Sequence, residues 1–114
     1  MSIERINPAK RWSDAVIHND TIYYTSVPEN LDADATAQTA NTLAAIDIML
    51  NQLGSDKSRI LDATIFLADK ADFAAMNAAW DAWVVDGHAP VRCTVESNLM
   101  NPKYKVEIKI IAAI

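Results

Sequence analysis

Apolar positions follow two different periods along this chain. Two runs rich in β-branched and aromatic residues, 16–18 and 21–25, flank the polar pair Asn19-Asp20, a pattern that predicts a β-hairpin. The spacing then changes to three and four residues, which is typical of an amphipathic helix, at Leu43, Ile46, Met49, Leu50 and Leu53. The first half therefore predicts two paired strands followed by one helix.

The second half repeats the strand and helix signals. Residues 59–67 form an apolar run of strand length, rich in β-branched residues. Helical spacing returns at Phe73, Met76, Trp80, Trp83 and Val84. Two further runs, 91–96 and 104–111, are separated by a loop that contains Asn101-Pro102.

Capping residues set the ends of both helices. Asp32 or Asp34 would begin the first helix and Gly54 would end it, while Gly87 would end the second. The resulting order, ββαβαββ, predicts an α+β fold with one mixed or antiparallel sheet and both helices packed on one face. Without repeats or linkers, residues 1–114 are expected to form a single domain.

Strand alternation divides the last two strands into faces. In the final strand Val106, Ile108 and Ile110 oppose the charged residues at 105, 107 and 109. In the preceding strand, Val91, Cys93 and Val95 oppose Arg92, Thr94 and Glu96. If the apolar sets meet the helices, Arg92 and Glu107 share the other face. Such a mixed face is typical of contacts between subunits, so we expect an oligomer.

Composition and charge narrow the class of protein. Hydrophobic residues make up 51% of the chain, and the formal net charge is −5. An acidic chain without runs of Lys or Arg lacks the electrostatic footprint of nucleic-acid binding. The sequence also shows no signal-peptide core and no apolar run long enough for a membrane span. With Cys93 as its single cysteine, the protein is expected to be cytoplasmic.

Arg92 and Glu107 are the strongest candidates for chemistry, and each has two interpretations. Arg92 could form an ion pair with Glu96 or Glu107 on the surface. Alternatively, its planar guanidinium could bind a substrate carboxylate through two parallel hydrogen bonds. Glu107 could be a solvated charge, or it could orient water and move a proton.

Other residues offer weaker candidates. Asn77 falls within the apolar face of the second helix, where it would form either a core hydrogen bond or a ligand contact. Cys93 is expected to be a buried, inert thiol, and Trp80 and Trp83 to be core residues. His18 and His88 have no metal-ligand spacing around them, and no glycine-rich phosphate loop occurs. We therefore expect no metal and no cofactor.

Taken together, these segments resemble the RidA/YjgF family, and most closely its short YoaB-like members. The resemblance rests on "SVPEN", "QTANTLAAIDIMLNQLGSDKSRILDATIFLADKADFAAMNAAWDAWV", "APVRCTV" and "NPKYKVEIKIIAAI". The most specific elements are Asp-Phe-x-x-x-Asn at 72–77, Pro-x-Arg at 90–92 and Val-Glu-Ile at 106–108.

The resemblance implies a chorismate-mutase-like fold, assembled as a homotrimer with sites in the clefts between subunits. It also implies hydrolysis of reactive enamine and 2-imino acids, such as 2-aminoacrylate, to 2-oxo acids and ammonia without a cofactor. By position, Arg92 would hold the substrate carboxylate, Glu107 would position the attacking water, and Asn77 would be the family's helix asparagine.

Five further positions depart from the deaminase pattern and complete the implied substrate pocket. Trp12 stands where a tyrosine is common, and Thr25-Ser26 stands where serine-glycine is common. Thr94 occupies the usual cysteine position, and the cysteine has moved to Cys93. A non-catalytic trimer that binds a 2-oxo acid is the alternative that the changes at Trp12 and Thr94 favour. A ribonuclease is disfavoured by the acidic charge balance.

Overall fold

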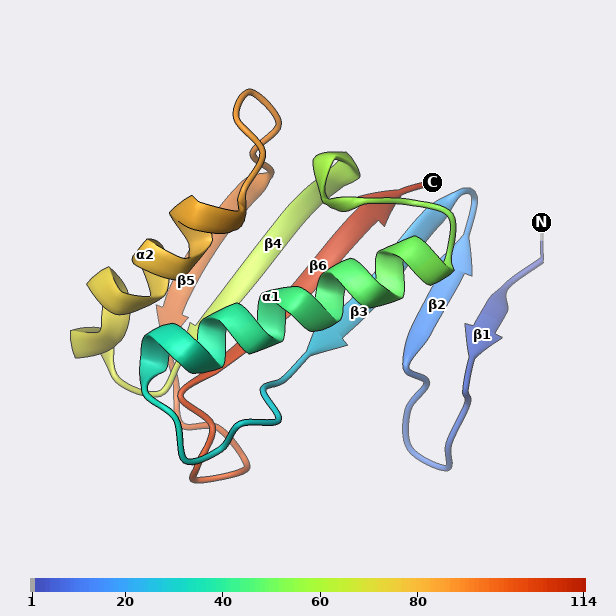
Figure 1. Ribbon diagram of the computed structural model, residues 1–114. Helices are drawn as coiled ribbons and strands as arrows, with labels where there is room; N and C mark the ends of the chain where they lie inside the picture. The colour runs from blue at the N-terminus through green and yellow to red at the C-terminus, as the bar shows by residue number, and fades with distance from the viewer. Residues whose placement is uncertain (1) are drawn as a thin grey trace.

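The computed structural model describes residues 2–114 and contains one six-stranded sheet covered by two helices on one face (Figure 1). The sheet order is β1-β2-β3-β6-β4-β5, with β4 and β5 parallel and the other pairs antiparallel. The elements are β1 Glu4–Ile6, β2 Ala15–His18, β3 Thr21–Ser26, α1 Ala35–Gln52, β4 Ile60–Leu67, α2 Phe73–Trp83, β5 Val91–Glu96 and β6 Val106–Ala113. The α+β fold predicted from the sequence is confirmed, and β1 is an addition that the sequence did not indicate.

Local chemistry explains the turns at the predicted places. Asn19 and Asp20 have φ of 52° and 57°, the left-handed pair of a two-residue hairpin turn that these side chains tolerate. The carboxylate of Asp34 accepts a hydrogen bond from the backbone N–H of Ala37 at 2.9 Å, so Asp34 caps α1. Gly54, at φ 81°, follows the last turn of α1 as predicted.

The predicted bounds of two elements were wrong. The helix α2 ends at Trp83, four residues before Gly87, because Val84 already has an extended backbone with ψ 142°. Gly87 instead occupies the turn that follows, at φ 77°. The last strand runs from Val106 to Ala113, two residues later than expected at each end.

The core lies between the helices and one face of the sheet. Side chains of α1 and α2 pack against alternate residues of β3, β4 and β6, and the largest buried groups include Ile22, Leu43, Ile46, Leu50, Ile65, Met76, Ile108 and Ile110. Burying such aliphatic side chains supplies the main stabilisation of a two-layer domain. Among residues 2–114, the structure has no helix long and apolar enough to cross a membrane.

The predicted facing of β5 was wrong. Arg92 pairs with Ala63 and Thr94 with Ile65, and both β4 residues are fully buried beneath the helices. Arg92, Thr94 and Glu96 therefore lie on the helix side of the sheet. Val91, Cys93 and Val95 lie on the open face, where Val91 is 75% exposed and Cys93 is exposed rather than buried. Alternation separates the two sets, but only the ladder with β4 decides which set faces the helices.

Candidate functional site

The side chain of Arg92 is held by two residues of α2. Its Nη1 donates a hydrogen bond of 2.8 Å to Oδ1 of Asn77. Its Cζ lies 5.2 Å from the centroid of the Trp80 ring, within the range of a cation–π interaction. Phe73, Asn77 and Trp80 are spaced by four and three residues, so they share one stripe of the helix. The contact that Asn77 was predicted to make is thus a hydrogen bond to Arg92.

No carboxylate neutralises Arg92 within residues 2–114. The carboxylate of Glu96 accepts a hydrogen bond from the backbone N–H of Lys70 at 2.7 Å. Glu107 lies between the buried residues Val106 and Ile108 in β6 and so points to the open face, opposite to Arg92. In this part of the chain the ion pair that forms is Lys103 with Asp32, at 3.5 Å. The surface-pair interpretation of Arg92 was therefore wrong.

A first cleft of about 250 Å³ opens beside this cluster. Its lining is mostly apolar with charged groups at the rim: Leu67, Lys70, Phe73, Thr94, Val95 and Glu96. The hydroxyl oxygen of Thr94 is buried and has no hydrogen-bond partner among residues 2–114. A buried hydroxyl without a partner is unfavourable unless a ligand or water supplies one, so Thr94 is a candidate contact for a polar atom in this cleft.

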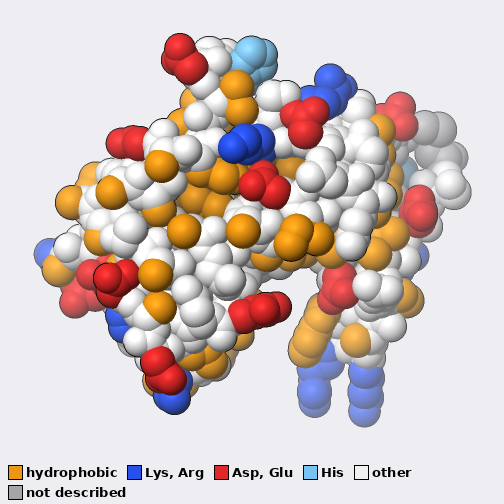
Figure 2. All heavy atoms as spheres, viewed as in Figure 1, with side chains coloured by type: hydrophobic (Ala, Val, Ile, Leu, Met, Phe, Trp, Pro, Cys, Tyr) orange, Lys and Arg blue, Asp and Glu red, His pale blue; other side chains and the backbone are white. Residues whose placement is uncertain are grey.

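A second, larger cleft of about 800 Å³ lies at the other end of the sheet. Trp12, Thr25 and Glu107 all line it, together with Tyr23, Met100, Tyr104 and Lys109. Figure 2 shows the molecule hollowed at its lower edge, between the β1–β2 hairpin and the loops on the other side. Trp12 is 66% exposed at this cleft, which is unusual for an indole in one isolated chain.

The structure thus divides the predicted site residues into two groups. Arg92, Asn77 and Thr94 lie together on the helix side, and Trp12, Thr25 and Glu107 lie together at the second cleft. In the first group Thr94 lines the first cleft, whereas Arg92 and Asn77 lie beside it. Ser26 and Cys93 line neither of the two clefts. Ser26 is buried and donates its hydroxyl to the carbonyl of Thr42 at 2.9 Å, and Cys93 points to the open face, 3.9 Å from the Thr64 hydroxyl.

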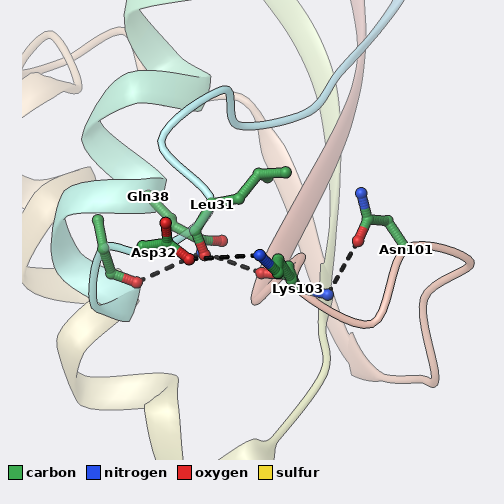
Figure 3. Close-up of polar contacts among 6 residues, drawn as sticks. Leu31, Asp32, Gln38, Asn101 and Lys103 are labelled. Atoms are coloured by element: carbon green, nitrogen blue, oxygen red, sulfur yellow. Dashed lines mark hydrogen bonds and ion pairs between the residues drawn. The ribbon is translucent and has the colours of Figure 1, made fainter.

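Gln38 is a functional candidate that sequence reasoning missed. Its side-chain amide is fully buried and donates to the carbonyls of Leu31 and Lys103 at 3.1 and 3.0 Å (Figure 3). Its carbonyl oxygen accepts from the backbone N–H of Lys105 at 2.8 Å. Gln38 therefore fastens the loop before β6, which carries Met100 and Tyr104 into the second cleft. The available signal was its position one turn before Thr42 on the buried stripe of α1.

Chemically, the first group can bind an anion. A half-buried guanidinium with neutral partners keeps its full charge and several N–H donors for a carboxylate. The second group offers a carboxylate, Glu107, with hydroxyl and aromatic neighbours. Within residues 2–114, no group of three His, Cys, Asp or Glu side chains is arranged to hold a metal ion.

Comparison with known proteins identifies the class of protein to which this fold and site belong. The chain belongs to the family described as endoribonuclease L-PSP, whose model matches residues 2–114. The RidA/YjgF resemblance is thereby confirmed, since a solved member of the YjgF protein family, NMB1025 from Neisseria meningitidis, is 46% identical. That structure has a TM-score of 0.93, covering 99% of this chain and 95% of that chain.

Several relatives are more specific. RutC family protein YoaB from Escherichia coli (strain K12) is 75% identical over the full length of both chains. A crystal structure from Salmonella typhimurium is also 75% identical, with a TM-score of 0.93 over 99% of this chain and 98% of that one. More distantly, the 2-iminobutanoate/2-iminopropanoate deaminase of Escherichia coli (strain K12) is 32% identical, covering 70% of this chain and 64% of that protein.

Proposed function

We propose that this protein hydrolyses reactive 2-imino and enamine acids to 2-oxo acids and ammonia, with Arg92 binding the substrate carboxylate. The observation that carries the proposal is the state of Arg92. It is half-buried, hydrogen-bonded to a neutral amide and free of any carboxylate partner within residues 2–114. An uncompensated cation beside a cleft that its neighbour Thr94 lines favours an anionic ligand. The deaminase relative supports the reaction type.

The division of the site into two groups supports an assembly in which subunits complete one another. Within one chain, Glu107 and Arg92 lie on opposite faces of the sheet, so they cannot act on one substrate. A homotrimer would bring the second cleft of one subunit to the Arg92 cluster of its neighbour. The open face supports association because Tyr23, Val91 and Val95 leave between 40% and 75% of their surface exposed there.

Hydrolysis of 2-imino acids needs little chemical activation by the protein. A protonated 2-imino acid is electrophilic at C2, and water adds to that carbon as the C–N double bond loses its π pair to nitrogen. Glu107 accepts a proton from the attacking water and passes it to the amine nitrogen of the tetrahedral intermediate. The C–N bond then breaks as the hydroxyl loses its proton to Glu107, which releases ammonia and the 2-oxo acid. Arg92 orients the carboxylate, and holding substrate and water in place supplies much of the acceleration.

The test is the rate of 2-oxo acid formation from an imine generated in situ by an amino-acid oxidase. Arg92→Ala should lower kcat/KM by roughly 30-fold to several thousand-fold, the effect of losing a desolvated charge contact. Arg92→Lys should recover part of the rate because an ammonium keeps the charge but loses the planar fork. Equal rates for the native protein and Arg92→Ala, after subtraction of the uncatalysed rate, would refute the proposal.

A second candidate function is non-catalytic binding of a 2-oxo acid by the same oligomer. The observation in its favour is that Trp12, which lacks a hydroxyl group, stands in the cleft that contains Glu107. Saturable binding of 2-oxobutanoate without acceleration of imine hydrolysis would select this function over the deaminase.

A further inference from the structure

The Trp80 ring against Arg92 belongs to a longer row of side chains. Trp80 is 5% exposed, and its ring centroid lies 5.2 Å from that of Trp83, with the planes tilted by 55°. The indole N–H of Trp83 donates to the carboxylate of Asp47 at 3.0 Å. Nζ of Lys57 lies 5.4 Å from the centroid of the Trp83 ring. Within this row, the ring that lies against the guanidinium of Arg92 is that of Trp80.

An aromatic ring stabilises a cation differently from a carboxylate. Arginine has a long flexible side chain, and ordering it costs conformational entropy. A carboxylate would order the guanidinium but would also neutralise it and compete with an incoming anion. The face of an indole attracts the cation through its quadrupole, with no formal charge and no acceptor atom. It can therefore order Arg92 and leave its hydrogen bonds for a ligand.

The hydrogen bonds that Arg92 makes leave part of its guanidinium available to a ligand. Within residues 2–114, the guanidinium has two acceptors in range, Oδ1 of Asn77 and the weak thioether sulfur of Met76 at 3.9 Å. Both accept a hydrogen bond from Nη1. Nη2 and Nε have no protein acceptor in this part of the chain. These are two of the N–H groups that a planar fork can present to a carboxylate.

We infer that Trp80 is a positioning residue, which holds the guanidinium of Arg92 in place without neutralising it and so sets the affinity for carboxylate ligands. The inference rests on the role proposed above for Arg92. Trp80 is a core residue that contacts no substrate, and it would nevertheless contribute part of the ligand affinity.

The experiment measures the dissociation constant of 2-oxobutanoate for the full chain by NMR titration. Trp80→Leu keeps an apolar side chain but removes the π face, and should weaken binding about 3- to 30-fold, the range expected for a partly desolvated cation–π contact. Trp80→Phe keeps a π face and should stay within about 3-fold of the native protein. The matched controls are Trp83→Leu and Trp83→Phe, which alter the neighbouring ring without touching Arg92 and should leave the affinity unchanged.

Each outcome bears on one of the two ideas. If Arg92→Ala binds 2-oxobutanoate as tightly as the native protein, the proposed function fails. If Arg92→Ala weakens binding and Trp80→Leu does not, the positioning role of Trp80 is wrong. Equal losses in Trp80→Leu and Trp80→Phe, or a matching loss in Trp83→Leu, would show that packing and not the π face is responsible. Should Trp80→Leu fail to fold, Trp80→Met takes its place in the same comparison.

Discussion

Among single residues, Tyr24 makes the stability of the fold depend on pH. Burial beside the core raises the pKa of the Tyr24 phenol above its ordinary value of 10.0, and the carboxylates of Asp14 and Glu29 raise it further, partly opposed by Ser26. A raised pKa means that the folded state holds the proton more tightly than the unfolded chain. The associated stabilisation is therefore complete below pH 10 and is lost as the pH rises through the folded-state pKa.

We expect the native protein to lose stability above pH 10 more steeply than Tyr24→Phe, which has no proton to lose at this position. Urea unfolding at pH 8 and at several values above 10 would measure the two slopes. Tyr23→Phe, a neighbouring tyrosine that is 40% exposed on the other face, is the control. Parallel slopes for the native protein and Tyr24→Phe would contradict the assignment.

Among elements, β5 shows what the sequence could and could not predict. The hairpin, the Asp34 cap and both helices follow from local signals, namely turn residues, capping side chains and apolar spacing. The helix side of β5 follows from the nonlocal pairing of Ala63 with Arg92, so the sequence left it undetermined. The three-residue strand β1 is too short to show any period.

The same reasoning applies to the candidate site. Residue types and spacing identified Arg92, Asn77 and Glu107, because charged or amide groups within apolar patterns require a partner. The separation of Glu107 from Arg92 depends on the strand order β6-β4-β5 and on which set of β5 faces the helices. Neither feature is encoded within one element. The contacts of Gln38 with Lys103 and Lys105, 65 and 67 residues away in the loop before β6, are equally nonlocal.

Because Gln38 joins α1 to two loops, we expect its side chain to stabilise their packing. Gln38→Leu would leave the partly buried carbonyls of Leu31 and Lys103 and the N–H of Lys105 without their partner. We expect the free energy of unfolding to fall by about 1 to 3 kcal/mol, the usual effect of leaving buried polar groups unsatisfied. Chemical denaturation measures this change, and Gln52→Leu, at the exposed end of the same helix, is the control. An unchanged midpoint for Gln38→Leu would show that these loops hold their positions independently.

At the scale of the whole molecule, the helices cover one face of the sheet and leave the other uncovered in the single chain (Figure 1). Trimerisation was expected through the face that bears Arg92, Thr94 and Glu96, but these residues lie beneath the helices. The open face instead carries Phe66, Ile111 and Val95 together with Glu107 and Lys109. Apolar groups among polar ones are typical of an interface between subunits, so we expect the trimer to form through this face instead.

Association through the open face makes Val91 a sensitive position. Val91 is 75% exposed in the single chain, so Val91→Lys should leave the subunit fold intact while placing a charge where a second subunit would bury it. An unpaired charge in an interface is unfavourable by about 3 to 5 kcal/mol, which would weaken association by roughly two to three orders of magnitude or more. Light scattering over a range of concentrations should therefore show a trimer for the native protein and smaller species for Val91→Lys.

The control is Ile48→Lys, which introduces the same charge on α1, on the opposite side of the molecule. Ile48 is 61% exposed, and this variant should remain trimeric. A native protein that stays monomeric, or a Val91→Lys variant that associates as tightly as Ile48→Lys, would mean that the open face is not the interface, and the composite site would then have no structural basis.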